Sequence, residues 1–250
     1  MENCIIYIFL FLLGICVGSF LNVLIYRLPL NKSIISPPSS CPNCNTKIKP
    51  WHNIPIFSWI FLKGKCAYCK EKISIRYPII EFLTGILAVL IYLKMKNIDI
   101  FYFTTFATFS GLLALAIIDI DYKAVPDNLN LLVLALSIFH SPDILENFKN
   151  ALLVIGGMSI IRWYLSYFIK KEAMGEGDLI IGGVMGAMLG INLSLIAIFI
   201  SAILAIIPSI YFLLQKKEPE LPFIPFLALG TFIVWYFSNF FNSYWSSLYA

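Results

Sequence analysis

The chain has 250 residues and a mass of 28.3 kDa, with 60% hydrophobic residues, only 13% charged residues and a net charge of +4. A soluble globular domain is roughly 45–50% apolar and about 25% charged, so the composition excludes an ordinary soluble enzyme, a disordered chain and a disulfide-rich secreted module. The mean hydropathy of +0.85 means that lipid must solvate much of the chain. The sequence therefore predicts an all-α polytopic membrane protein.

The first predicted element is a transmembrane helix that occupies residues 4–26, within an N-terminal segment 1–26. A bilayer core about 30 Å thick needs about 20 apolar residues, and this run supplies them. Glu2 stands where a signal peptide carries a basic residue, and no small-residue cleavage site follows the apolar run. We therefore expect a retained span rather than a cleaved signal peptide.

A basic segment, residues 27–76, follows the first span. It holds nine of the eighteen Lys and Arg residues and one acid, Glu71, and so carries +8 while the rest of the chain sums to −4. A basic patch can indicate nucleic-acid binding. Because apolar spans flank this segment on both sides, a cytoplasmic loop without a nucleic-acid partner is the better interpretation.

Two C-x-x-C pairs lie in this loop, Cys41-Pro-Asn-Cys44 and Cys66-Ala-Tyr-Cys69, with 21 residues between them. Two such pairs can close a tetrahedral zinc site with four thiolates, which leaves no open position for catalysis. The alternative is two disulfides, which a reducing cytoplasm disfavours. The spacing therefore predicts a structural Zn²⁺ held by Cys41, Cys44, Cys66 and Cys69, whose binding supplies folding energy to the loop.

Seven further spans are expected in a membrane domain over residues 77–250. They are 77–93, 100–118, 129–141, 150–169, 179–190, 192–214 and 222–241. The apolar run from 179 to 214 is too long for one helix, and we divide it at Gly190-Ile191-Asn192, a turn-like sequence. The total is about eight transmembrane helices.

The orientation follows from the distribution of basic residues. If 27–76 is cytoplasmic, alternation places 119–128, 170–178 and 215–221 on the same side, and these loops hold five lysines, Lys216 and Lys217 among them. Cytoplasmic loops of membrane proteins carry an excess of Lys and Arg. The pattern predicts eight spans with both termini outside.

Four charged residues lie within or at the edge of spans, namely Glu81, Asp119, Arg162 and Asp178. A charge in the hydrocarbon costs about 2.5–3.5 kcal/mol on insertion scales, so each asks for an explanation. Glu81 and Arg162 have the simpler interpretation of structural groups, and their mutual pairing is only a hypothesis. Asp119 and Asp178 fall at the same cytoplasmic depth on different helices, where two carboxyl groups can share one proton.

Such a pair can perform aspartic-protease chemistry without a covalent acyl-enzyme. Asp178, Gly182, Gly186 and Gly190 recur every four residues, and this small-residue face predicts that a neighbouring helix approaches closely. Asp121 competes with Asp119 for the role, because two residues apart on a helix they point in different directions. Two other functions stay open at this point, a proton- or ion-coupled transporter and a zinc-stabilised scaffold whose acids only cap helices.

The chain resembles the type IV prepilin leader peptidases, which are membrane aspartic proteases of the GxGD class. The similar segments run in order along the chain: Gly18-Ser19-Phe20-Leu21-Asn22-Val23, the four cysteines, Asn53-Ile54-Pro55-Ile56, Arg76-Tyr77-Pro78 to Glu81, Asp119-x-Asp121-x4-Pro126-Asp127, and Gly175-x-Gly177-Asp178.

The resemblance implies that Asp119 and Asp178 are the catalytic pair. It further implies a multi-pass protein of the inner membrane that removes the basic leader of prepilins or pseudopilins, after a glycine, on the cytoplasmic side. Many members then N-methylate the new terminus with S-adenosylmethionine, an activity associated with the cytoplasmic loop. That loop contains no glycine-rich nucleotide motif, so the residues alone do not locate a methyl-donor site.

Overall fold

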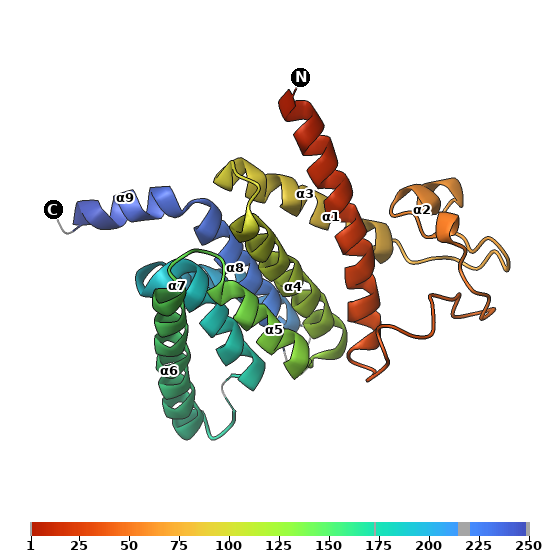
Figure 1. The fold of residues 1–250 in the computed structure, drawn as a ribbon. Helices are drawn as coiled ribbons and strands as arrows, with labels where there is room; N and C mark the ends of the chain where they lie inside the picture. The colour runs from red at the N-terminus through yellow and green to blue at the C-terminus, as the bar shows by residue number, and fades with distance from the viewer. Residues whose placement is uncertain (1, 173, 215–220, 249–250) are drawn as a thin grey trace. The chain divides into compact units, whose positions relative to one another are not determined.

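The structure is a computed structural model that describes residues 2–172, 174–214 and 221–248 (Figure 1). Across these residues it contains nine α-helices and one short 3-10 helix, and extended pairing is limited to two isolated antiparallel bridges. The all-helical prediction is thus confirmed. Lys216 and Lys217, expected on the cytoplasmic side, lie outside the described residues. The chain divides into two compact units, Met1–Lys96 and Asn97–Ala250.

The first unit is built on two apolar helices, α1 (Glu2–Arg27) and α3 (Arg76–Met95), which pack against each other. Their close approach requires glycines. A Cβ added to Gly14 would lie 2.7 Å from the Gly85 Cα, and one added to Gly18 would lie 2.7 Å from the Glu81 Cα. Small residues four apart are the usual device by which two membrane helices bring their backbones together.

The loop between α1 and α3 carries the cysteines. It contains the short helices η1 (Pro50–His52) and α2 (Phe57–Phe61). The two bridges, Ser40 with Lys47 and Lys65 with Lys72, each close a turn around one C-x-x-C pair. Local structure in this loop is therefore organised around the cysteines rather than around an apolar core.

The second unit contains six helices, α4 (Ile100–Tyr122), α5 (Asp127–Ile138), α6 (Ile144–Ile169), α7 (Glu176–Leu214), α8 (Ile224–Tyr236) and α9 (Ser238–Leu248). Helices α5 and α8 each pack against both α4 and α7, and α6 packs along α7 (Figure 1). Because α5 and α8 hold both partners, they fix the end of α4 relative to the start of α7.

The predicted division of the run from 179 to 214 falls at a real kink. Gly190 has φ 71° and ψ 177° inside α7, a conformation that only glycine adopts readily. The glycine face that precedes it packs on α6 as expected. A Cβ on Gly182 would collide with the Met158 sulfur, and one on Gly186 would lie 2.5 Å from the Asn150 carbonyl oxygen.

Five helices of the described chain are long and apolar enough to cross a membrane, or six if the bent pair α8–α9 counts as one span. The eight expected segments correspond to α1, α3, α4, α5, α6, the two halves of α7, and α8. The expected span 222–241 is not one straight helix, because it bends by 74° after Tyr236, where Ser238 and Asn239 end the apolar run. An eight-span topology stays a prediction.

We expect Gly186→Ala to lower the free energy of unfolding by about 1–3 kcal/mol, because the new methyl group overpacks the contact with Asn150. Gly156→Ala is the matched control, since nothing lies within 4 Å of a Cβ placed there. The control should stay within about 1 kcal/mol of the parent. Unfolding in mixed detergent micelles measures both, and equal stabilities would contradict the packing of α6 on α7.

Candidate active site

Asp119 lies in the last turn of α4 and is only 8% exposed. Its Oδ2 accepts a hydrogen bond from the backbone N–H of Ile224, at 3.1 Å, where α8 begins. Asp121, its competitor in the sequence, is exposed. The buried carboxyl group at the end of α4 is therefore that of Asp119, and a backbone amide 105 residues later in the chain orients it.

Asp178 lies in the first turn of α7 and is half-buried. Its Oδ2 accepts a hydrogen bond from the backbone N–H of Gly175 at 3.1 Å. The turn before it is fixed from both sides. Fully buried Asn130 on α5 donates from Nδ2 to the Gly177 carbonyl oxygen at 3.2 Å, and a Cβ on Gly177 would lie 2.9 Å from Val125 Cγ2.

The two carboxyl groups lie on helix ends that share the same neighbouring helices. One comes from the end of α4 and the other from the start of α7, and both helices pack on α5 and α8. Each carboxyl group is held through Oδ2 by one backbone N–H. A pair held in this way has the composition of an acid–base couple that can activate water against a peptide bond.

Glu81 and Arg162 each have partners within their own unit. Arg162 Nη2 lies 3.6 Å from a carboxylate oxygen of Glu176 and 3.9 Å from one of Glu172, which places a cation beside the turn that carries Asp178. Glu81 Oε2 accepts the N–H of Ile56 at 2.7 Å. The mutual pairing considered from the sequence is not needed to explain either residue.

Asn130 and the backbone amides of Ile224 and Gly175 hold the two acids or the turn beside them, and none of the three was predicted from the sequence. Asn130 had a usable signal, because an amide within an apolar segment must find hydrogen-bond partners. The two amides had none, since a backbone N–H has no side-chain signature.

The four cysteines of the loop meet in one cluster, as the sequence predicted. Their sulfur atoms all lie within 4.8 Å of one another, and Cys41 Sγ is 3.7 Å from Cys69 Sγ. A tetrahedral zinc site with bonds of about 2.3 Å places its sulfurs about 3.8 Å apart, so the donor set fits such an ion. All six cysteines of the chain are free thiols. The cluster can therefore hold a metal ion.

The local hydrogen bonds favour the thiolate form of one cysteine in the cluster, Cys44. Hydrogen bonds with the side chain and the backbone of Thr46 lower the pKa of the Cys44 thiol to about 6. The thiolate is the form of cysteine that binds metals. Burial and the neighbouring thiols raise the pKa of the Cys69 thiol to about 11, so the thiols of the cluster do not ionise independently of one another.

The fold defines a multi-pass membrane protein with two carboxyl groups at the ends of apolar helices and a four-cysteine cluster that could hold a metal ion. Two family models match it, the Bacterial Peptidase A24 N-terminal domain over residues 12–95 and the Type IV leader peptidase family over residues 106–210. The cysteine cluster falls in the first match, and Asp119 and Asp178 fall in the second.

Similar curated proteins carry the name prepilin leader peptidase/N-methyltransferase. The protein of Stutzerimonas stutzeri is 32% identical, over 88% of this chain and 87% of its own length. Those of Neisseria gonorrhoeae and Pseudomonas aeruginosa are each 33% identical, over 89% of this chain and 87% of their own lengths. No solved structure matches the chain. The chain belongs to the type IV leader peptidase family.

Proposed function

We propose that the chain is a membrane-embedded aspartic endopeptidase that removes the basic leader of type IV prepilins or pseudopilins after a glycine. We further propose that it N-methylates the amino terminus that this cleavage creates. Family membership and the names of the curated relatives support both activities and favour them over transport. The single observation that carries the peptidase proposal is geometric: Asp119 and Asp178 lie on the ends of two helices that both pack against α5 and α8, and one backbone N–H orients each carboxyl group.

In the proposed reaction one aspartate accepts a proton from water as the water oxygen attacks the scissile carbonyl carbon. The other aspartate, protonated, donates to the carbonyl oxygen, and the leaving amine then takes up a proton as the carbon–nitrogen bond breaks. The backbone amides of Ile224 and Gly175 keep both carboxyl groups oriented. The reaction needs no covalent intermediate with the enzyme.

The position of the pair suits a prepilin. A basic leader followed by an apolar helix places its scissile bond where the membrane meets the cytoplasm. Asp119 ends one apolar helix and Asp178 begins another, and the basic residues predict that this side is cytoplasmic. We therefore place the protein in the inner membrane with eight spans, both termini outside and the acid pair facing the cytoplasm.

The loop between α1 and α3 is the proposed zinc site, with Cys41, Cys44, Cys66 and Cys69 as ligands and a structural role for the ion. The implied methyl donor is S-adenosylmethionine, which supplies an electrophilic methyl group for a free amine. The amine must lose its proton before it can attack, so the transferase site needs an acceptor for that proton.

Mass spectrometry of a purified prepilin incubated with the protein tests the proposal. The expected products are a free leader that ends in glycine and a mature chain that is 14 Da heavier when the methyl donor is present, a mass increment of about one CH₂. An intact prepilin after prolonged incubation with well-folded protein would refute the peptidase.

We expect Asn130→Leu to reduce kcat for cleavage about tenfold or more while KM changes little. The change removes the donor that fixes Gly177, and a misplaced catalytic group costs rate rather than binding. Ser137→Ala, at another fully buried polar position on α5, is the matched control and should keep most of the activity. Cleavage kinetics of both variants provide the measurement. Equal kcat values for the two variants would contradict a positioning role for Asn130.

A further inference from the structure

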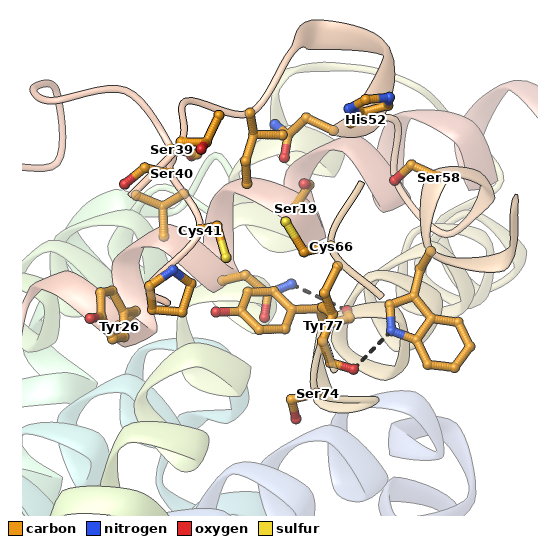
Figure 2. Close-up of a pocket in the computed structure, with 18 of the residues that line it drawn as sticks. Ser19, Tyr26, Ser39, Ser40, Cys41, His52, Ser58, Cys66, Ser74 and Tyr77 are labelled. Atoms are coloured by element: carbon orange, nitrogen blue, oxygen red, sulfur yellow. Dashed lines mark hydrogen bonds between the residues drawn. The ribbon is translucent and has the colours of Figure 1, made fainter. Parts of the chain in front are cut away.

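The first unit contains a cavity of about 790 Å³ between the α1–α3 pair and the cysteine loop (Figure 2). Small-molecule sites typically occupy roughly 300–1,000 Å³, so the cavity is large enough for a ligand. Every residue that lines it falls between Ser19 and Glu81, and the proposed peptide cleavage uses none of them. The cavity is therefore a candidate ligand site separate from the acid pair.

A carboxylate lies at the wall that the two membrane helices form. Glu81 on α3 is 7% exposed, and it accepts hydrogen bonds from the Ile56 N–H, at 2.7 Å, and from the Ser19 side chain. Burying an ionised carboxylate without a positive charge beside it costs free energy, and a bound cation would offset that cost. Both of these donors to Glu81 are uncharged, so a cationic ligand would supply the missing charge.

A second acceptor lies on the same wall. Asn22 on α1 donates from Nδ2 to the carbonyl oxygens of Gly18 and Tyr77, both at 3.2 Å. These two bonds fix the orientation of the amide, and its buried Oδ1 finds no donor among the described residues. Two acceptors together, one of them charged, select a ligand with positive charge or several N–H groups.

Glu81 also holds a strained turn of the loop. Ile56 has φ 60° and ψ −54°, the strained conformation at the centre of a γ-turn with positive φ, which is unusual for a β-branched residue. Such conformations persist only where surrounding contacts fix them, and they concentrate at ligand sites. Here the fixing contact is the bond from the Ile56 N–H to Glu81. The acid thus binds the loop to the membrane helix at the edge of the cavity.

Aromatic rings and exposed lysines complete the walls. Tyr26, Trp59 and Tyr77 line the cavity, and Trp59 is held by a bond from Nε1 to the Ile73 carbonyl oxygen at 3.2 Å. Lys32 and Lys72 are exposed lining residues, which suit a ligand carboxylate. Figure 2 shows Cys41 and Cys66 among the lining residues, so the metal cluster forms part of the same wall.

We propose that this cavity binds S-adenosylmethionine, with the positive charge of the ligand against Glu81 and Asn22. The ligand combines an adenine ring, a cationic sulfonium with an ammonium group, and a carboxylate, and the walls offer aromatic faces, two acceptors and two lysines for these parts. The inference rests on the proposed N-methyltransferase activity. It assigns the transferase site to residues of α1, α3 and the loop, apart from the acid pair of the second unit.

The first test is equilibrium binding of radiolabelled S-adenosylmethionine to the purified full-length chain in micelles. Glu81→Gln removes the charge but keeps an oxygen that can accept from the Ile56 N–H, so the turn can remain in place. We expect the dissociation constant for S-adenosylmethionine to rise about tenfold or more, which is the effect of losing one charge-assisted hydrogen bond. Glu146→Gln, which removes an equal charge from an exposed ion pair with Lys149, is the control and should bind as the parent does.

If Glu81→Gln disturbs the loop, the variant should lose bound zinc. A second pair of variants then tests the cavity without changing Glu81. Ser58 lines the cavity from α2 (Figure 2), and Ser58→Trp fills space that the ligand needs, whereas Ser58→Ala leaves it open. We expect tenfold or more weaker binding for the first and near-parental binding for the second.

Parental affinity in both Glu81→Gln and Ser58→Trp, or no binding by the parent chain, would overturn the inference. Prepilin cleavage by the same preparation tells these failures apart from a failure of the proposed peptidase, because cleavage depends on the acid pair and not on the cavity.

Discussion

Asp119→Asn and Asp178→Asn are each expected to abolish prepilin cleavage, with kcat lowered about 10³-fold or more. Asparagine keeps the size of the side chain and can still accept the backbone N–H of Ile224 or Gly175, so the geometry is preserved. What it removes is the ability to take up or release a proton at that position. In the proposed reaction the two acids act as one unit, so either loss should remove nearly the whole effect of the pair.

Asp121→Asn is the matched control for these variants. It lies two residues from Asp119 but is exposed, so it should retain cleavage within a few-fold of the parent. Initial rates with a purified prepilin, together with melting temperatures that confirm folding, give the measurement. If both substitutions in the pair left cleavage intact, the aspartic-protease assignment would be wrong.

Cys66→Ser is expected to empty the metal cluster and to loosen the loop between α1 and α3. Cys66 is 8% exposed, and the loop has little apolar core to hold it without a metal. Zinc binding by small four-ligand domains is worth about 10–16 kcal/mol, so losing one of four thiolates should cost most of the affinity. Elemental analysis should find zinc in the parent and little in the variant, and proteolysis within residues 27–76 should accelerate.

Cys16→Ser is the control for this experiment, because Cys16 is an exposed thiol of α1 outside the cluster. It should retain the full metal content and the protease resistance of the parent. Full metal occupancy in Cys66→Ser would exclude a site built from all four thiolates.

Much of the fold follows from features that have direct physical signatures in the sequence. The break at Gly190 was predictable because a turn-like sequence interrupts an apolar run too long for one span. The packing face of Gly182 and Gly186 was predictable because glycines spaced by four residues fall on one side of a helix. The bend after Tyr236 was not foreseen, although Ser238 and Asn239 interrupt the apolar pattern there.

The two acids could be singled out from the sequence, but the way in which the fold holds them could not. Apolar context marks Asp119 and Asp178 as costly and hence informative. The sequence does not reveal that α8 orients Asp119 through the Ile224 N–H, because every residue except proline carries that group. In the same way, the contact of Asn130 with Gly177 depends on α5 packing beside α7, which no local pattern specifies.

Whether Asp119 and Asp178 act together on the scissile bond can be measured by the binding of a leader peptide whose scissile carbonyl is replaced by a tetrahedral hydroxymethylene. Such a group resembles the transition state, and transition-state analogues bind about 10²-fold or more tighter than substrates. We expect this tight binding to be lost in Asp119→Asn and equally in Asp178→Asn, while the unmodified leader peptide binds all three proteins alike. Tight binding of the analogue that survives either substitution would show that the two aspartates do not act together on the scissile bond.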